Sequence, residues 1–393
     1  MAEVTGVIEV EDSAGLGEKI ALVVVSLMAI GTIFVFSAGV DVGKGINFEK
    51  FYESTNLRKV LFFPLAIGIM SAMARVDYRR LSMAKGLLRS PITYLFIFSV
   101  ILLVIVLLPG IGSEINQARR WLRIPLGPAT ISFQPSEFAK WVVIFGLAGF
   151  CIKYGERLKS FWRGFVPACL VVGTVVVLVI IEDFGSAALI ALLSFFVLLV
   201  GGADWKHLAA PLPFAAVGFV LAVITSPTRK IRILAFLNHD RWAGSANYQA
   251  AQSLIAIGSG GLFGKGLGMG VCKYGHLPED TTDFIFAIIS EELGFVGAAS
   301  VIALFIVFLV LGFLVVMRCQ DPFGKLLATS IVMAVGVQAA LNIGVVTVVL
   351  PTKGLPLPFV SAGGTSMLLS AAAVGVLLNI ASKAGQMSFG DDR

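Results

Sequence analysis

The chain has 393 residues, of which 57% are hydrophobic and 14% are charged, and its formal net charge at pH 7 is +6. Soluble domains carry about 25% charged residues, so this composition, with a mean hydropathy of +0.92, excludes an ordinary soluble protein. Several apolar runs reach the roughly 18 residues that cross a bilayer. We therefore expect a polytopic integral membrane protein in contact with anionic lipid, and no nucleic-acid partner.

Cysteine and histidine usage limits the kinds of site that the chain can hold. The four cysteines are scattered and form no CxxC pair, and the three histidines are scattered as well. This pattern indicates neither a disulfide framework nor a zinc site. The first 18 residues are polar and acidic, so no cleavable signal peptide is expected.

Ten apolar segments predict an all-α integral membrane protein with about ten transmembrane helices. Their approximate ranges are 19–38, 59–75, 90–109, 136–152, 164–181, 185–203, 207–225, 284–316, 325–346 and 363–382. The eighth segment is longer than a bilayer needs, so its first turns are expected to be tilted or interfacial. Around this membrane domain, at 19–383, lie an N-terminal tail at 1–18 and a C-terminal tail at 384–393.

Basic residues gather in the loops after the second, fourth and eighth spans. They are Arg75, Arg79, Arg80, Lys85, Arg89, Lys153, Arg157, Lys159, Arg163, Arg318 and Lys325. The positive-inside rule makes this side of the membrane cytoplasmic, together with both termini. The longest loop, about 226–283 between the seventh and eighth spans, is then extracytoplasmic.

Two loops on the opposite side are also basic, which the simple charge rule does not explain. One follows the third span and contains Arg119 and Arg120, and the long loop contains Arg229, Arg241 and Lys265 among its cations. These charges are either solvated or in contact with lipid head groups, or they form a pocket for an anionic substrate on the outer face.

The stretch LPEDTTDFIFAIISEELGFVG, residues 277–297, concentrates acidic residues at the start of the eighth span. Asp283 lies at the junction of loop and membrane, where partial desolvation raises the pKa of a carboxylate and makes it a better base. Asp283 could equally cap the helix, and the two roles can coexist. Glu291 and Glu292 lie about two turns further, where a buried pair satisfied by neighbouring helices is favoured over direct catalysis.

The segment NYQAAQSLIAIGSGGLFGKGLGMG, residues 247–270, precedes that junction. Its first part has the pattern of a short amphipathic helix on the membrane surface. The glycine-rich part lacks the Lys-Ser or Lys-Thr ending of a Walker A motif, so it is weak evidence for nucleotide binding.

Three further segments carry candidate side chains. In FQPSEFAK, Glu137 and Lys140 share a helix face, and a structural ion pair explains them as well as a site does. In ARRWLRI, Trp121 is either an interfacial anchor or a site residue. The segment LPTKGLPLPFVSAGGTS contains Lys353 and Ser361 and is too rich in Pro and Gly to span, so it is expected to line a cavity or to be buried in protein.

Taken together, these stretches resemble the SEDS family (shape, elongation, division and sporulation), which includes FtsW, RodA and SpoVE. The resemblance rests on ARRWL followed by FQPSEFAK, EDFGSAAL, YQAAQSLIAIGSGGLFGKGLG, LPEDTTDFIFAIISEELGFVG and LPTKGLPLPFVSAGGTS, all in family order. The wording PTKG is more similar to FtsW than to RodA.

Two positions and one segment depart from the usual family sequence. Thr281 stands where the family usually has His, and Ala362 stands where it usually has Tyr. The segment that commonly reads QPDLGT contains Glu182 and Asp183 followed by Phe-Gly-Ser. The departures put in doubt any role of those particular side chains and leave the family's central acid at Asp283.

The resemblance implies an inverting peptidoglycan glycosyltransferase that polymerises lipid II at the outer face of the cytoplasmic membrane, in division or elongation. Asp283 is the expected base. The expected substrate contacts are Trp121, Arg119, Arg120, Glu137, Lys140, Arg241, Lys265, Lys353 and Ser361. No cofactor is certain, although a divalent cation such as Mg²⁺ or Mn²⁺ could share the charge of the pyrophosphate, with Glu279 and Asp280 as the residues that could hold it.

The implied partners are a class B penicillin-binding protein, which cross-links the glycan, and other membrane proteins of the divisome or elongasome. Two alternatives to the enzyme stay open. A lipid II flippase would need a polar path across the bilayer, whereas the polar candidates here gather on the outer loops. The third alternative is a scaffold with no chemistry of its own.

Overall fold

The computed structural model describes residues 13–39, 54–84, 86–115, 118–126, 129–237, 248–272 and 281–388. Within these residues, seven helices are long and apolar enough to cross a membrane, and three shorter apolar helices accompany them. Each of the ten expected spans coincides with one of these helices. The protein is therefore an all-α integral membrane protein, as its composition predicted.

The membrane helices have the following bounds. They are α1 Ser13–Gly39, α3 Ser54–Arg75, α4 Pro91–Leu107, α5 Pro135–Leu158, α6 Val166–Ile180, α7 Phe184–Val200, α9 Leu212–Ile224, α12 Ile285–Arg318, α13 Pro322–Val346 and α14 Gly364–Ser388. Short helices precede two of them, with η4 Phe161–Phe165 before α6 and α8 Trp205–Ala209 before α9. On the connections lie η2 Tyr78–Leu81, η3 Leu87–Arg89, α10 Pro227–Leu237 and α11 Tyr248–Gly260.

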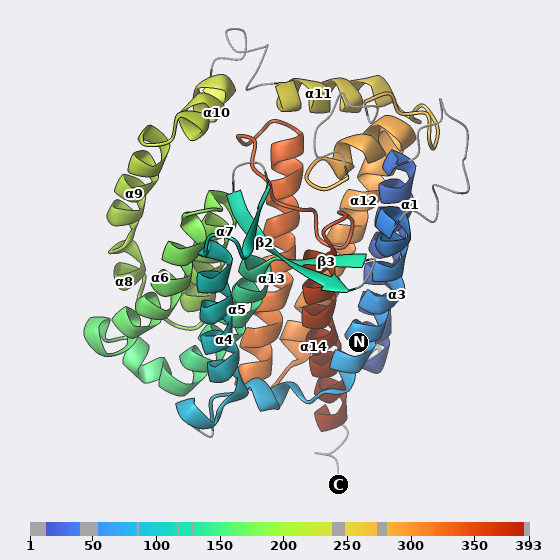
Figure 1. The fold of residues 1–393 in the computed structure, drawn as a ribbon. Coiled ribbons are helices and arrows are strands. Elements are labelled where there is room, and N and C mark those ends of the chain that lie inside the picture. The colour runs from blue at the N-terminus through green and yellow to red at the C-terminus, as the bar shows by residue number, and fades with distance from the viewer. Residues whose placement is uncertain are drawn as a thin grey trace, which may run out of the picture.

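Helices α13 and α14 run through the centre of the molecule, with α1 and α3 on one side and α4 to α7 on the other (Figure 1). Their contact with α12 buries Phe308, Ile331 and Val374 completely. At the crossing of α14 with α3, a Cβ on Gly375 would clash with the main chain of Met70, so glycine is what allows the two helices to approach this closely.

The start of α1 and the end of α14 lie at the same end of the bundle. A Cβ on Gly17 would lie 3.8 Å from the Cβ of Ala381. An even number of spans brings the start of the first and the end of the last span to the same side, which agrees with the ten expected helices. The candidate site described below lies at the opposite end, where α5, α7, α12 and α14 begin and α13 ends.

The connection between α4 and α5 is an antiparallel sheet, whereas a loop was expected there. Its strands are β1 Gly112–Ile115, β2 Ala118–Leu126 and β3 Ala129–Phe133, in the order β1-β2-β3. The far end of the sheet is fixed to the start of α14, because the Thr365 hydroxyl donates to the Ser132 carbonyl at 3.0 Å. Contact of this kind with a distant helix leaves no signal in the local sequence.

Helices α8, α9 and α10 form an arm along one edge of the molecule (Figure 1). Helix α11 lies across one end of the molecule. None of residues 212–224, all of which the structure describes, is buried. The short helix expected near residue 248 is confirmed as α11, and the Ser253 hydroxyl ties it to the end of α13 by donating to the Val346 carbonyl at 2.7 Å.

Helix α12 is broken at Gly294, whose φ of +68° is a conformation that glycine adopts readily. The part from 295 to 318 is about 36 Å long at about 1.5 Å per residue, which suffices for a bilayer core of about 30 Å. The turns before the break are therefore in excess of a span, and they carry the site residues toward the bilayer surface.

Candidate functional site

Asp283 lies two residues before the first residue of α12, Ile285. Phe284 occupies the N-cap position, and its side chain makes no capping hydrogen bond. The amides of Ala287 and Ile288 donate to the carbonyl of Phe284, at 2.9 and 3.4 Å. The structure thus assigns the N-cap position to Phe284. Both roles that the sequence left open for the Asp283 side chain, capping and acting as base, stay predictions.

A buried amide holds the main chain of Asp283 against the connection between α13 and α14. The side-chain nitrogen of Asn342, a residue 1% exposed, donates to the carbonyls of Asp283 at 2.8 Å and Leu355 at 2.6 Å. The carboxylate lies so close to Gly354 that a Cβ there would be 2.9 Å from Asp283 Oδ2. The two segments therefore meet at the Asp283 carboxylate.

Ser361 fixes the residues just before Asp283. Its hydroxyl donates to the Thr282 carbonyl at 2.5 Å and accepts the Leu357 amide at 2.8 Å, and the residue is 3% exposed. The amide of Ala362 donates to the Thr281 carbonyl at 2.9 Å. Thr281 and Ala362, the two departures from the family wording, thus meet through main-chain atoms, so this contact does not depend on their side chains.

Next to Gly354, a cavity of about 150 Å³ opens between the arm, the turn before α7 and the α13–α14 connection. Its charged lining residues are Arg120, Arg229, Arg232 and Lys353, with the acids Glu182 and Asp183. We call this cavity the cationic pocket. The four cations come from three elements that are far apart in the chain, namely β2, α10 and the α13–α14 connection.

The charges of the cationic pocket influence one another. Burial lowers the pKa of Arg232, and repulsion from Arg120 lowers it further, while the Asp283 carboxylate opposes both. This coupling relates Asp283 to the pocket electrostatically as well as through Gly354. Burial also lowers the pKa of Lys353, an effect that attraction to Asp183 opposes. A site with cations held close together and partly desolvated is suited to binding an anion.

Phe184, the first residue of α7, connects the arm to the rest of the pocket. The Arg229 guanidinium lies 5.3 Å and the Lys353 ammonium 5.0 Å from the centre of its ring. The ring of Phe219, on α9, is 5.7 Å away. Cation–π contacts of this kind hold both cations at the pocket without neutralising them.

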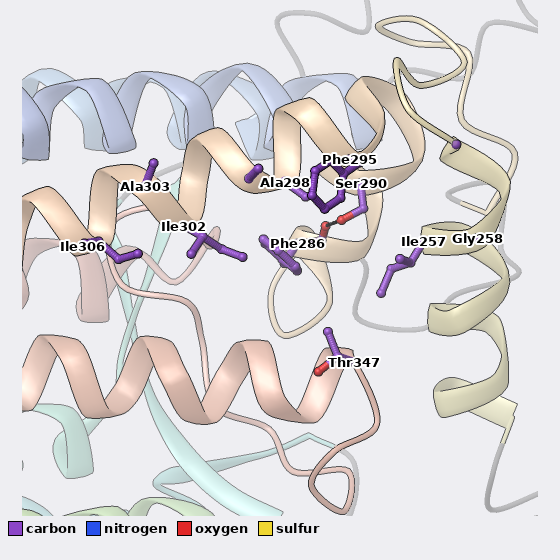
Figure 2. A pocket seen from close by; sticks show the side chains of 12 residues that line it. Ile257, Gly258, Phe286, Ser290, Phe295, Ala298, Ile302, Ala303, Ile306 and Thr347 are labelled. Carbon is purple, nitrogen blue, oxygen red and sulfur yellow. Dashed lines mark hydrogen bonds between the residues drawn. The ribbon is translucent and has the colours of Figure 1, made fainter.

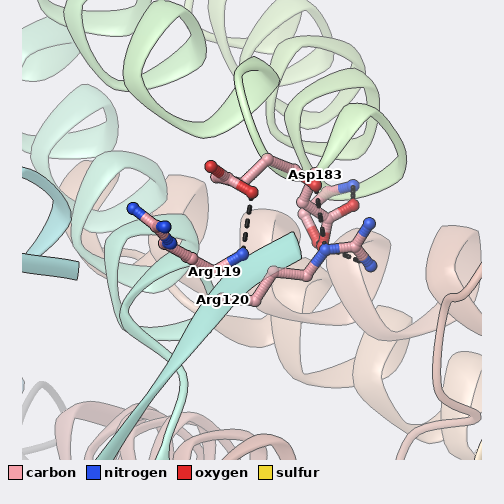
Figure 3. Close-up of polar contacts among 5 residues, drawn as sticks. Arg119, Arg120 and Asp183 are labelled. Atoms are coloured by element: carbon pink, nitrogen blue, oxygen red, sulfur yellow. Dashed lines mark hydrogen bonds and ion pairs between the residues drawn. The ribbon is translucent and has the colours of Figure 1, made fainter. Parts of the chain in front are cut away.

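Arg120 lies on strand β2, and its side chain lines the pocket while contacting the turn before α7 (Figure 3). Arg120 Nε donates to the Glu182 carbonyl at 2.9 Å, and Nη1 lies 3.8 Å from Asp183 Oδ2. The main-chain amide of Arg119 donates to Glu182 Oε2 at 2.7 Å. The Arg119 guanidinium instead pairs with Glu114 at 3.6 Å, and Arg119 is not among the residues that line the pocket.

Glu137 and Lys140 form a buried ion pair inside the bundle. Lys140 Nζ lies 2.8 Å from Glu137 Oε2 and donates to Gln338 Oε1 at 2.7 Å, and both charged side chains are 2% exposed. Gln338 Nε2 in turn donates to the Pro356 carbonyl at 2.9 Å. These contacts support a structural role for the ion pair. The hydrogen bonds that start at Lys140 end on the α13–α14 connection, which faces Asp283.

Glu291 and Glu292 are fully buried and hold the glycine-rich segment after α11. Glu291 pairs with Lys265 at 2.7 Å. Glu292 accepts the Ser37 hydroxyl at 2.9 Å and the Gly268 amide at 2.9 Å. The expectation of a buried pair satisfied by its neighbours is confirmed. Lys265 is engaged here and does not line the cationic pocket.

The remaining expected residues divide into two groups. Trp121 pairs with Ser113 in the sheet and is not part of the pocket lining, and Arg241 lies outside the described residues, as do Glu279 and Asp280. The sequence analysis counted Arg229 and Arg232 among the basic residues of the long loop but selected neither of them as a site residue. In PTRKIRILAFL these two cations are three residues apart, which places them on one face of helix α10. That spacing was the signal in the sequence that could have singled them out.

Within the described ranges, no group of three or more His, Cys, Asp and Glu side chains stands together as a metal cage. Glu182 and Asp183 are occupied by the amides of Arg119 and Ser186. Among the described residues these acids form no cage for a metal, and no chemical step is assigned to one.

A second and larger cavity, of about 560 Å³, lies between α11 and α12 (Figure 2). Its lining is apolar apart from Ser290 and Thr347, and the Ser290 hydroxyl already donates to the Phe286 carbonyl at 2.7 Å. With no charged side chain in its lining, this cavity does not fit an anion, in contrast to the cationic pocket.

Comparison with known proteins identifies the family. A family model described as a cell cycle protein, covering FtsW, RodA and SpoVE, matches residues 18–386. The chain belongs to the FtsW/RodA/SpoVE family. A probable peptidoglycan glycosyltransferase FtsW of Aromatoleum aromaticum is 38% identical over 369 residues, covering 93% of this chain and 87% of the relative. Stage V sporulation protein E of Bacillus subtilis is 36% identical over 362 residues, covering 92% and 95%.

Solved structures of FtsW/RodA/SpoVE relatives share this fold. A chain from a peptidoglycan synthase complex that coordinates polymerization and crosslinking superposes with a TM-score of 0.70 at 25% identity, covering 93% of this chain and 97% of that one. The rod shape determining protein RodA of Thermus thermophilus gives a TM-score of 0.61 at 26% identity, covering 92% and 95%.

Proposed function

We propose that this family member is a peptidoglycan glycosyltransferase that polymerises lipid II into β-1,4-linked glycan at the outer face of the cytoplasmic membrane. The observation that carries the proposal is the position of the Asp283 carboxylate against Gly354, at the edge of a pocket with four cations. The names of the FtsW relatives as glycosyltransferases support the same reaction.

The reaction needs one base and a means of stabilising a departing anion. The acceptor sugar's 4-hydroxyl loses its proton to the Asp283 carboxylate as its oxygen attacks C1 of the donor sugar. The bond between C1 and the lipid pyrophosphate breaks, and the pyrophosphate leaves with the bonding electron pair. Attack from the face opposite the leaving group inverts the anomeric carbon. Glycoside hydrolysis commonly needs a second carboxyl group as acid, but a pyrophosphate is already a good leaving group.

The cations of the pocket match the charge that develops during this step. Positive groups already held in place near a departing phosphate stabilise the transition state without reorganising. Arg120, Arg229, Arg232 and Lys353 line one cavity beside Asp283 and are the groups we assign to the pyrophosphate. Burial of Arg232 and Lys353 strengthens their attraction for an anion, because less water screens them.

A divalent cation, if the reaction uses one, is proposed to arrive with the substrate. Mg²⁺ commonly binds through one or two carboxylates together with substrate phosphates. Isothermal titration with Mn²⁺ in the absence of substrate is then expected to show no binding to the full chain, and binding is expected once a lipid pyrophosphate is present.

We further propose that the start of α1 and the end of α14 face the cytoplasm, because the basic connections after α3, α5 and α12 lie on that side. As the crosslinking partner we propose a class B penicillin-binding protein. The likeness to a chain of a peptidoglycan synthase complex supports a partner of this kind.

The test of the proposed function is polymerisation of fluorescent lipid II by the purified full chain, supplied with its crosslinking partner. Asp283→Asn removes the base and keeps the size of the side chain. We expect wild type to make glycan polymer and Asp283→Asn to make none. Asp204→Asn is the matched control, because Asp204 caps α8 at the other end of α7 by accepting the Lys206 amide at 3.0 Å.

Polymer from Asp283→Asn at the wild-type rate would contradict the proposal. Absence of polymer from every variant, together with transfer of lipid II across the bilayer of a sealed vesicle, would favour the flippase instead.

A further inference from the structure

The register of the sheet singles out Arg120. Ser113 of β1 pairs with Trp121, and the next residue, Glu114, pairs with Arg119. Arg120 therefore has no partner on β1 and is the extra residue of a β-bulge. A bulge bends its strand and redirects a side chain, and bulges are frequent beside active sites. Here the redirected side chain is the one that β2 contributes to the lining of the cationic pocket.

A bulge also disturbs the regular pairing of main-chain amides. At this bulge the amide of Arg119 does not depend on a neighbouring strand, because Glu182 Oε2 accepts it at 2.7 Å. A charge-assisted hydrogen bond of this length is among the stronger polar contacts in proteins. The side chain of Glu182, from the turn before α7, thus accepts the main-chain hydrogen bond that a neighbouring strand accepts in a regular sheet.

The same turn also aims the Arg120 side chain. The Glu182 carbonyl accepts Arg120 Nε at 2.9 Å, and Asp183 Oδ2 lies 3.8 Å from Nη1. The turn is itself rigid, because Asp183 caps α7 by accepting the Ser186 amide at 3.1 Å and the Ser186 hydroxyl at 2.8 Å. Of the five N–H donors of the Arg120 guanidinium, the Glu182 carbonyl takes the one on Nε. Nη1 faces Asp183 in an ion pair at 3.8 Å, and the Nη groups keep N–H donors for an anion.

We propose that Glu182 is a positioning residue, which holds the β2 bulge so that Arg120 presents its Nη groups to the pyrophosphate of the substrate. This inference rests on the proposed function, because it names how one cation of that site is placed. Glu182 acts through Arg120 and does not itself touch the reacting atoms.

The experiment is a double-mutant cycle between Glu182 and Arg120 in the lipid II polymerisation assay. Glu182→Ala removes the acceptor of the Arg119 amide and is expected to lower kcat/KM by about 10- to 100-fold, the equivalent of one charge-assisted hydrogen bond. Glu182→Gln retains a side-chain oxygen that can accept this amide and is expected to restore most of the activity. In an Arg120→Ala background, Glu182→Ala is expected to have little further effect.

The matched control is Glu114→Ala, because Glu114 lies on the same sheet and contacts the Arg119 guanidinium, with a side chain 57% exposed. We expect it to leave kcat/KM unchanged. Melting temperatures of all variants separate a positioning role from a loss of fold. Independent, multiplying effects of Glu182→Ala and Arg120→Ala would overturn the inference, as would wild-type kinetics of Glu182→Ala.

Failure of the inference is distinguishable from failure of the proposed function. Polymerisation that requires Asp283 but not Glu182 would overturn the positioning role alone. Polymerisation that does not require Asp283 would overturn the proposed function.

Discussion

Gly354→Ala is the most direct perturbation of the proposed base that leaves the base itself unchanged. The added Cβ would lie 2.9 Å from Asp283 Oδ2 and 3.8 Å from its Cγ. To reach ordinary van der Waals contact, the carboxylate must withdraw by about half an ångström. Productive geometry tolerates displacements of about 0.5 Å, and a misplacement of about 1 Å can cost about 100-fold in rate. We therefore expect kcat to fall by about 10-fold or more.

The fold should tolerate this substitution. Gly354 is not among the described glycines with positive φ, and the atom that the new methyl group meets is the end of a side chain that can rotate. The assay is the polymerisation of fluorescent lipid II, with the melting temperature of each variant measured in the same detergent. We expect the melting temperature of Gly354→Ala to equal that of wild type.

Gly363→Ala is the control from the same connection. A Cβ at Gly363 meets Ser366 Cβ at 3.4 Å, which is an ordinary contact, so wild-type kcat is expected. Retention of wild-type kcat by Gly354→Ala would refute the reasoning, because the Asp283 carboxylate would then not act from the position it occupies beside Gly354. A lowered melting temperature together with lowered activity in both variants would refute the claim that the effect is local.

Two further predictions concern the charges around the site. Burial lowers the pKa of Lys353 below its usual 10.5, so its positive charge is lost at a lower pH than that of a free lysine. Because the folded state holds this proton less tightly than the unfolded state, the free energy of unfolding rises slightly with pH between the two pKa values. Lys353→Arg stays charged, so KM measured against pH should rise at higher pH in this variant than in wild type, and coincident profiles would contradict the assignment. Lys140→Met leaves the buried Glu137 carboxylate without its cation and should destabilise the protein by about 3–5 kcal/mol, measured by unfolding in detergent. Lys159→Met, which breaks an exposed pair with Glu156, should have an effect of less than about 1 kcal/mol, and equal losses in the two variants would contradict the role of burial.

Much of this protein follows from composition and local pattern alone. The ten spans were predictable, because the length of an apolar run directly reflects the thickness of the bilayer. Glu291 and Glu292 were recognisable as a buried pair, since an acid within a span must find partners inside the protein. Asp283 stood out because acidic residues at the junction of loop and membrane are unusual in so apolar a chain, and because the family resemblance placed the central acid there.

Other features depended on contacts between distant segments. The β1–β2–β3 sheet was missed because its strands are held by α14 and the turn before α7 and not by their own periodicity. That Phe284 occupies the N-cap position of α12 became evident only in the structure.

The cationic pocket itself was decided by tertiary structure. Arg120, Arg232 and Lys353 are separated by more than 100 residues along the chain and meet because β2, the arm and the α13–α14 connection converge before α7. The sequence by itself determined which groups lie near a membrane surface, since hydropathy controls depth in the membrane. Only the packing of the helices decided which of those groups face Asp283, because lateral neighbours depend on contacts that no local pattern records.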